Sequence, residues 1–275
     1  MLLGGKIMKI LTVQDISCYG QCSTTVALPV LSCYGHETVI LPSAILSTHT
    51  GGFTGFTVLD LTEEMPKIMK HWEKENIKFD ALYTGYIGDA RQFDYILDIK
   101  NKMMNDKGLF FVDPAMADHG KMYYGLGDTI VEGMRRMCMQ ADYILPNITE
   151  ACFLTGVEYK EKQDEKFINE LLDKLFKLGA KNVILTGVEE DDELGAIAYD
   201  GKEKVKVMKK RQYPSYHGTG DIFSSVIIGN ILNGKSLYET LDDATSFIVE
   251  AIKETKKDKE HNYGVKYEQV LKKRH

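Results

Sequence analysis

Long apolar runs are missing from this sequence of 275 residues. None reaches the roughly 18 residues that a membrane-spanning helix needs, and the apolar stretch at the start is too short for a signal peptide and lacks a cleavage site. Basic charge is not in excess either, because 40 acidic side chains against 34 lysines and arginines leave a net charge of −6. We therefore expect a protein that acts neither on membranes nor on nucleic acid. Met1 and Met8 are both candidates for the start of translation.

Cysteine is scarce as well, and its spacing matches no metal site. None of the five cysteines stands in a C-x-x-C pair, and no nearby pair of histidines completes a zinc pattern with Cys18 and Cys22. We interpret these thiols as structural or incidental, which is consistent with a reducing cytoplasm. Linkers rich in proline, glycine or serine, internal repeats and low-complexity tracts are also absent. Residues 1–275 are therefore predicted to form one domain.

The apolar residues that are present alternate between short β-rich runs and longer helical stretches. Buried strands are predicted at 8–14, 37–43, 79–87, 109–115, 141–147 and 181–187, and helices at 23–34, 62–76, 91–106, 127–139 and 164–179. This alternation predicts an α/β fold with a mainly parallel central sheet and helices on both faces. Two strand-like runs within 193–210, joined by Asp200 and Gly201, predict an antiparallel hairpin at one edge. From 219 onward the pattern is helical.

Several familiar site motifs are also missing. The sequence has no G-x-x-x-x-G-K-[ST] loop, no G-x-S-x-G elbow, no kinase H-R-D and no G-x-G-x-x-G after the first strand. The P-loop class of nucleotide-binding proteins is therefore excluded. What the sequence does have is a set of polar motifs after the predicted strands, where ligands of parallel sheets bind.

The most distinctive of these motifs is Gly218-Thr219-Gly220-Asp221, at the start of an apolar helix. One interpretation is ordinary capping by threonine or aspartate, worth about 1 kcal/mol. The other is an anion site, in which flexible glycines let a phosphate approach the free N–H groups of the helix. A carboxylate beside an anion is unfavourable unless a metal ion or a proton transfer requires it. The four residues alone leave both interpretations open.

A second signal is Asn147-x-x-Glu150, which opens a helix after another strand. An amide and a carboxylate suit a hard cation such as Mg²⁺ that keeps several waters, but the same pair also forms a capping box. Asp113 ends a further strand, either as a third acidic group of this site or as a turn residue before Pro114. Thr186, which Gly187 follows after the sixth strand, offers a hydroxyl group to a phosphate oxygen.

Together these motifs resemble the ribokinase-like superfamily, and within it the pyridoxal (vitamin B6) kinase branch. The resemblance runs in order from Lys9 to Gly234 and covers most of the chain. It implies a ribokinase-like three-layer sandwich, ATP and Mg²⁺ as cofactors, and a monovalent cation such as K⁺ as a further candidate. By resemblance, the motif from Gly218 to Asp221 forms the anion hole for the γ-phosphate, with Asp221 as the catalytic base.

The resemblance also implies where the two substrates bind. On the nucleotide and metal side it implies Asp113, Asp118, Asn147, Glu150, Thr186 and Gly187, with His217 either touching the nucleotide or capping a loop. On the vitamin side it implies Asp15, Ser17, Tyr86 and the S-T-H-T-G loop with Ser47, His49 and Thr50. Asp118, Asn147 and Glu150 are the implied metal ligands. A homodimer is the implied assembly.

The sequence departs from the family pattern at Asp15, where many pyridoxal kinases carry serine. A carboxylate facing the vitamin ring would favour a protonated ring nitrogen or a cationic aminomethyl group, so we expect pyridoxamine to be accepted alongside pyridoxal. The first strand also passes through one helix to the second, which leaves no room for the lid strands of sugar kinases.

The implied function is ATP-dependent phosphorylation of the 5′-hydroxymethyl group of vitamin B6, that is of pyridoxal, pyridoxamine and pyridoxine. Two alternatives stay open. One is a hydroxymethylpyrimidine or phosphomethylpyrimidine kinase of thiamine synthesis, with the same fold and mechanism. The other is a B6-binding protein without catalysis. Fold alone does not choose among them, because function depends on the site residues.

Overall fold

The structure is a computed structural model that describes residues 6–274, so the candidate start at Met1 lies outside it. The strands are β1 Lys9–Ser17, β2 Glu37–Leu46, β3 Val58–Asp60, β4 Phe79–Thr84, β5 Met104–Val112, β6 Ala117–Asp118, β7 Lys121–Met122, β8 Tyr143–Ile144, β9 Asn182–Glu190, β10 Glu193–Tyr199 and β11 Lys204–Lys210. The helices are α1 Thr24–Cys33, α2 Met65–Lys74, α3 Arg91–Lys102, α4 Asp128–Cys138, α5 Ile148–Thr155, α6 Glu165–Lys177, α7 Thr219–Leu232, α8 Leu237–Thr255 and α9 Glu268–Arg274.

The main sheet has the strand order β11-β10-β9-β8-β5-β4-β1-β2-β3. Its six central strands, from β9 to β2, pair in parallel. β10 and β11 continue the sheet antiparallel at one edge, and β3 pairs antiparallel with β2 at the other. The predicted parallel sheet with an antiparallel edge is therefore confirmed, and β3 and the small β6–β7 hairpin add to it.

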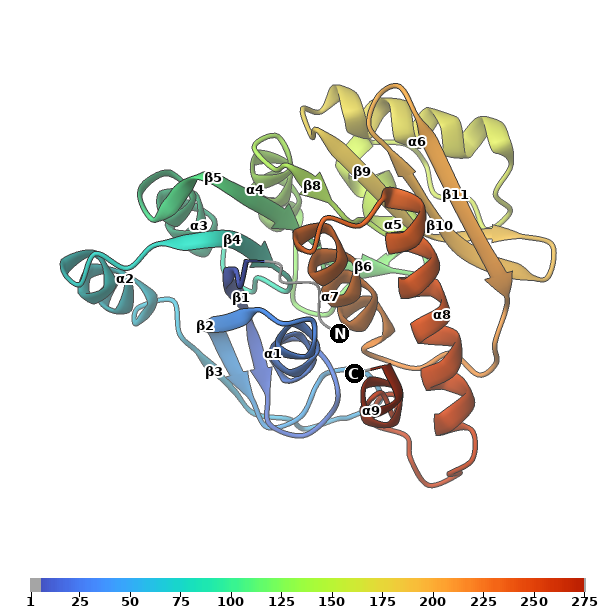
Figure 1. Cartoon of the computed structure of the whole chain (residues 1–275), viewed down its shortest axis with the longest axis horizontal. Helices are drawn as coiled ribbons and strands as arrows, with labels where there is room; N and C mark the ends of the chain where they lie inside the picture. Colours follow the sequence, from blue (N-terminus) through green and yellow to red (C-terminus); the bar gives the residue numbers. More distant parts are fainter. Residues whose placement is uncertain (1–5, 275) are drawn as a thin grey trace.

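Helices cover both faces of this sheet, which confirms the three-layer sandwich. One buried cluster joins the sheet to residues of α2 to α6, and the other joins it to residues of α1, α7, α8 and α9. Figure 1 shows this second group together on one side of the sheet. All residues of α7 from 222 to 230 are buried, because the helix packs on both α1 and α8. That position explains why its sequence is apolar all round.

Some predicted boundaries are wrong. The helix expected over 91–106 ends at Lys102, and β5 already begins at Met104, five residues before the predicted strand. Alternation of polar and apolar residues is weak at this start, where residues 105–107 are exposed, so periodicity could not place it. β1 extends three residues beyond the prediction, to Ser17, and therefore carries Asp15 on the strand itself.

The connections at the start of the chain are too short to hold the lid strands of sugar kinases, as predicted. Only residues 18–23 separate β1 from α1, and only 34–36 separate α1 from β2. The loop from 47 to 57 leaves β2 and returns through the short β3. Among the residues that the structure describes, no helix is both long and apolar enough to cross a membrane.

Candidate active site

The polar motifs meet at the carboxyl edge of the parallel strands. From β1 the chain passes to β2 on one side, and later returns to β4 on the other side of β1. The strand order thus reverses at β1, and such a reversal opens a crevice outside the strand ends. The end of β1 carries Asp15 and Ser17, and Tyr86 follows the end of β4. The α7 N-terminus adds the Gly218–Asp221 motif to this crevice.

Asp15 is a buried carboxylate at this reversal point. The pairing register between β1 and β2 shifts opposite Asp15, a bulge of the kind that re-aims a side chain. The hydroxyl of Ser17 donates to Asp15 Oδ2 at 2.8 Å, and the hydroxyl of Ser23 also donates to this carboxylate. Burial raises the pKa of Asp15 above its usual value, and these hydroxyl donors offset part of the rise. Its carboxylate contacts hydroxyl groups and, within residues 6–274, forms no ion pair.

The N-terminus of α7 has no side-chain cap. Gly218 is the N-cap residue and makes no side-chain cap hydrogen bond, and the Asp221 carboxylate accepts from its own backbone N–H and from that of Ser23. The Thr219 hydroxyl instead donates to the backbone carbonyl of Tyr216 at 3.2 Å. A Cβ atom at Gly220 would meet no atom within 4 Å, so there is open space in front of the helix. The capping interpretation is therefore wrong, and the free N–H groups and the helix dipole favour an anion here.

Asp221 lies half-buried in the first turn of this helix. Burial raises the pKa of its carboxyl group to about 6, and the nearby charge of Asp15 adds to the rise. The backbone N–H of Ser23 donates to the carboxylate and lowers the pKa in part. A carboxyl group with a pKa near 6 is deprotonated at neutral pH and more basic than an exposed aspartate, which suits a general base.

Gly218 holds the turn before α7 against the β1–α1 loop. Its φ of 78° lies in the left-handed region, and a Cβ atom at this position would stand 1.8 Å from the carbonyl oxygen of Gln21. Only glycine satisfies both conditions. The same loop supplies Ser23 to Asp221, so the β1–α1 loop contacts the anion-binding turn at two points.

The S-T-H-T-G loop lies beside the same crevice. His49 is buried, and its backbone N–H donates to the carbonyl of Tyr19 at 3.2 Å. Ser47 closes the base of the loop, because its Oγ atom accepts from the backbone N–H of Thr57 at 2.9 Å. Thr50 is exposed. Tyr86 is half-buried; burial raises its pKa, and the charge of Asp15 adds to the rise.

Asn147 and Glu150 do form the capping box. Asn147 Oδ1 accepts from the backbone N–H of Glu150 at 2.9 Å, and Glu150 Oε2 accepts from the backbone N–H of Asn147 at 2.8 Å. The capping interpretation is thus confirmed. The remaining amide of Asn147 donates to the carbonyl of Ala117 at 2.8 Å, which ties α5 to the β6–β7 hairpin. Asp118, at the end of β6, is exposed next to this contact.

Asp113 and Glu150 form a buried acidic pair. Asp113 Oδ2 accepts from the hydroxyl of Ser224 on α7 at 2.7 Å. Burial is the main cause that raises the pKa of both carboxyl groups. The charge of Asp221 raises the pKa of Asp113 further, and the charge of Asp113 raises that of Glu150. In residues 6–274 no cluster of three or more His, Cys, Asp or Glu side chains makes a complete metal site. Mg²⁺ rarely needs one, because it keeps waters and binds substrate phosphates.

Thr186 lies directly beside Asn147, in the middle of β9. The two residues form an isolated parallel bridge, and the backbone N–H of Thr186 donates to the carbonyl of Pro146 at 2.9 Å. Gly187 follows with a positive φ of 71°, and its carbonyl accepts from the side chain of Gln163 at 3.2 Å. Thr186 and Gly187 therefore lie within β9, beyond the point where β8 ends, and the prediction that they follow the sixth strand is wrong because this strand continues to Glu190.

Sequence reasoning missed two residues that hold this site together. Ser23 contacts both Asp15 and Asp221. Its backbone has an unusual positive φ of 50°, and no sequence motif predicts this conformation. Ser224 binds Asp113, and its signal was present: it stands three residues after Asp221 in a helix, so both side chains lie on the same helical face.

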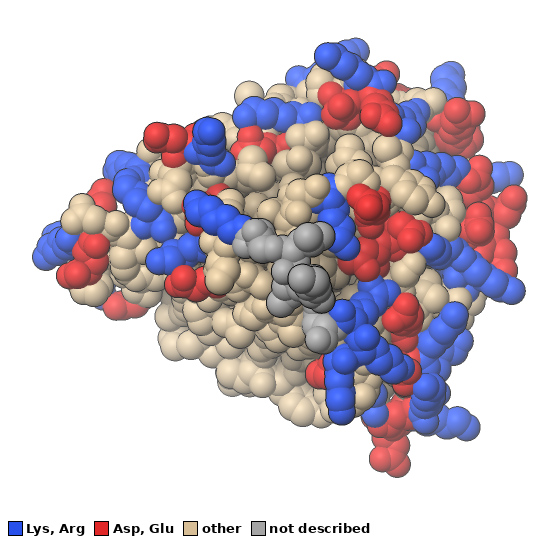
Figure 2. All heavy atoms as spheres, in the orientation of Figure 1, with Lys and Arg blue, Asp and Glu red and all other residues tan. Residues whose placement is uncertain are grey.

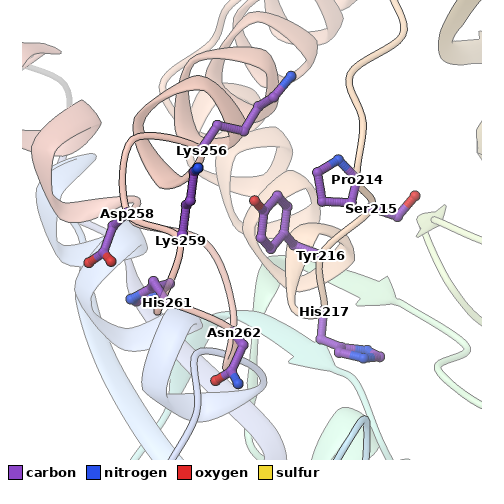
Figure 3. A pocket seen from close by; sticks show the side chains of 9 residues that line it. All are labelled: Pro214, Ser215, Tyr216, His217, Lys256, Asp258, Lys259, His261 and Asn262. Atoms are coloured by element: carbon purple, nitrogen blue, oxygen red, sulfur yellow. The ribbon is translucent and has the colours of Figure 1, made fainter.

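A pocket of about 510 Å³ opens behind the anion-binding turn. It lies between the segment before Gly218 and the loop after α8, and its lining residues are Pro214, Ser215, Tyr216, His217, Lys256, Asp258, Lys259, His261 and Asn262. In Figure 3 the imidazole of His217 points away from the other labelled side chains. His217 is therefore a border residue between this pocket and the S-T-H-T-G loop.

The fold and this site define a class: α/β enzymes with an anion-binding turn and a basic aspartate at a strand-end crevice. The family model described as phosphomethylpyrimidine kinase matches residues 12–266, so the chain belongs to this family of kinases. Among solved structures it resembles a Bacteroides thetaiotaomicron protein assigned as a phosphomethylpyrimidine kinase and crystallised with pyridoxal, at 37% identity and a TM-score of 0.92, covering 98% of this chain and 96% of that one.

Two further relatives carry the pyridoxal kinase name. The pyridoxal kinase of Lactobacillus plantarum is 31% identical, with a TM-score of 0.89 over 97% of this chain and 96% of that chain. The pyridoxal kinase of Dictyostelium discoideum is 26% identical over 91% of this chain and 87% of its own length. The resemblance to the pyridoxal kinase branch is therefore confirmed.

Proposed function

We propose that this protein transfers the γ-phosphate of ATP to the 5′-hydroxymethyl group of vitamin B6, that is of pyridoxal, pyridoxamine and pyridoxine. The observation that carries the proposal is the uncapped N-terminus of α7 with Asp221 in its first turn. It supports an anion site and a base side by side. The similarity to pyridoxal kinases supports the vitamin as the acceptor.

In this reaction Asp221 takes the proton of the vitamin's hydroxyl group as its oxygen attacks the γ-phosphorus. The new O–P bond forms while the bond to the bridging oxygen of ADP breaks. The N–H groups of Gly218, Thr219 and Gly220 stabilise the charge on the transferred oxygens. Thr186 and Gly187 are proposed to contact the other phosphates, since they lie beside Asn147 at the same strand edge. Positioning and charge stabilisation are the main needs of such a transfer.

The acidic pair at the strand ends fits a cation. Asp113 and Glu150 are both buried, and the charge of Asp113 raises the cost of charging Glu150, which a bound cation would relieve. We propose that Mg²⁺ is held through water by Asp118, Asn147 and Glu150, where it would neutralise phosphate charge. A monovalent cation such as K⁺ is a further candidate at Asp113.

The direct test is ADP release by the purified protein with ATP, Mg²⁺ and each ring compound separately. We expect release with pyridoxal, pyridoxamine and pyridoxine, and less with hydroxymethylpyrimidine. The second candidate, a hydroxymethylpyrimidine or phosphomethylpyrimidine kinase, is favoured by the family description. Preference for the pyrimidine would establish it. Binding of a vitamer without any ADP release would instead establish a non-catalytic B6 binder.

Asp15 is proposed to select among the rings. It is buried, it accepts from the hydroxyl groups of Ser17 and Ser23, and its charge acts on both Tyr86 and Asp221. A carboxylate in that position favours a protonated ring nitrogen or an aminomethyl cation. Asp15→Ser should therefore lower kcat/KM for pyridoxamine more than for pyridoxal. An unchanged ratio between the two vitamers would remove Asp15 from this role.

We also propose a homodimer in a reducing compartment such as the cytoplasm. All five cysteines are free thiols, as is usual there. Figure 2 shows few charged side chains over α1 and β2 on the face in view. Val58 and Leu59, on the adjoining edge strand β3, are more than half exposed, as is typical of a surface that another chain covers.

A further inference from the structure

His217 lies against the S-T-H-T-G loop. Its ring centroid is 5.4 Å from that of His49, at a tilt of 46°. A Cβ atom at Gly51 would stand 2.5 Å from Cε1 and Nδ1 of His217, so the imidazole occupies the space that any side chain at residue 51 would need. Residue 51 must therefore be glycine for the His217 ring to pack against the loop.

The next residue, Gly218, opens the anion-binding turn and is fixed from the other side by the Gln21 carbonyl. His49 is likewise fixed against the β1–α1 loop, because a Cβ atom at Gly20 would stand 2.0 Å from its Cδ2 atom. The β1–α1 loop thus contacts both the S-T-H-T-G loop and the turn, and His217 closes the remaining gap between those two.

The contact between the two histidines is one of packing, with no ion pair. Burial lowers the pKa of His49, and the nearby His217 lowers it further, so His49 is neutral at neutral pH. Phe53 extends the contact, with its ring centroid 5.0 Å from that of His49 and a T-shaped arrangement. Aromatic contacts of this geometry hold loops in place with little net charge.

We propose that His217 is a positioning residue that holds the vitamin-side loop in register with the anion-binding turn. This inference rests on the proposed function, in which the hydroxyl group of the vitamin must meet the γ-phosphate at that turn. Misplacement of one reactant by about 1 Å can cost about 10²-fold in rate. His217 acts through the loop and the turn and is not a group that reacts.

The first test is steady-state kinetics of His217→Ala. We expect KM for pyridoxal to rise by about tenfold and kcat to fall by about tenfold, with KM for ATP changed by less than about twofold. His217→Phe keeps a ring in the gap and should recover most of the loss. His71→Ala, an exposed histidine on α2, is the matched control and should behave as the wild type. A rise in KM for ATP alone, or no change in any parameter, would overturn the proposal.

A second test needs no activity, so it separates this inference from the proposed function. Amide hydrogen exchange of the unliganded protein should be faster in the loop 47–57 of His217→Ala than in the wild type, with the rest of the chain unchanged. Gly51→Ala should also speed exchange in this loop, and His217→Ala added to it should bring no further increase, since the added methyl group then has room. Equal exchange in wild type and His217→Ala would contradict the proposal even in an active kinase. Absence of phosphorylation by the wild type would contradict only the proposed function.

Discussion

At the scale of single residues, Asp221 combines two properties that oppose each other. It lies in the first turn of α7, directly after Gly220, which faces open space, yet burial raises its pKa to about 6. This placement destabilises the folded protein, because it keeps a charge in a poorly solvated position. The same feature makes Asp221 a stronger base. The base role that we propose for Asp221 and the stability of the fold therefore make opposite demands on this side chain.

As a base with a raised pKa, Asp221 should give the activity a defined pH profile. The base is active when deprotonated, so kcat/KM should rise with pH through an apparent pKa of about 6 and reach a plateau above it. Asp221→Asn should lower kcat by about 10²–10⁴ and leave ATP affinity nearly unchanged. Turnover measured from acid to neutral pH tests both. A variant that keeps most of its activity would exclude Asp221 as the base.

Asp221→Asn should lower activity but raise the stability of the folded protein. Because the pKa of Asp221 is raised in the folded state, folding becomes less favourable as the pH rises from about 4 to about 6, and the full cost remains above that range. Asp221→Asn should therefore raise the free energy of unfolding by about 1–3 kcal/mol at neutral pH, and by almost nothing below about pH 4. Denaturant unfolding measures this. Asp128→Asn, in the exposed first turn of α4, is the control, and an equal gain there would refute the explanation.

At the scale of elements, the two glycines of the α7 turn have different tasks. Gly218 meets the backbone of the β1–α1 loop, whereas Gly220 faces open space. Gly218→Ala should therefore disturb the turn itself and lower both activity and thermal stability. Gly220→Ala should leave the melting temperature within about 2 °C and lower kcat/KM for ATP by at least about tenfold, because its methyl group enters the space for the phosphate. Similar losses of stability in both variants would contradict this division.

Elements also show what the sequence could predict and what it could not. Strands and helices of the parallel core followed from periodicity, because their burial repeats along the chain. The start of β5 did not, since residues 105–107 are exposed although they belong to a strand. The bulge opposite Asp15 is invisible in the sequence as well, because it arises from the register of two strands. Motifs thus predicted a candidate site, whereas pairing between distant segments determined where Asp15 and Ser23 lie in it.

At the scale of the whole molecule, the edge strand β3 predicts assembly. The exposed Val58 and Leu59 lie on a strand whose outer edge is unpaired within the described chain. We expect the wild type to be a dimer by light scattering, and Val58→Lys or Leu59→Lys to shift it toward the monomer. Tyr124→Lys, at an exposed tyrosine between β7 and α4, is the control and should leave the mass unchanged. A monomeric wild type at micromolar concentration would rule out the proposed dimer.

The two carboxylates Asp15 and Asp221 also bear on how the product of the proposed reaction leaves the site. The charge of Asp15 raises the pKa of Asp221, and neither carboxylate forms an ion pair within the described residues. A ring that arrives with a positive charge is attracted there, whereas the phosphorylated ring that forms carries added negative charge next to the same two groups. Repulsion then works against rebinding of the product. The acidity that draws the vitamin in would thereby oppose the attraction of the α7 N-terminus for the product's phosphate and speed its exit.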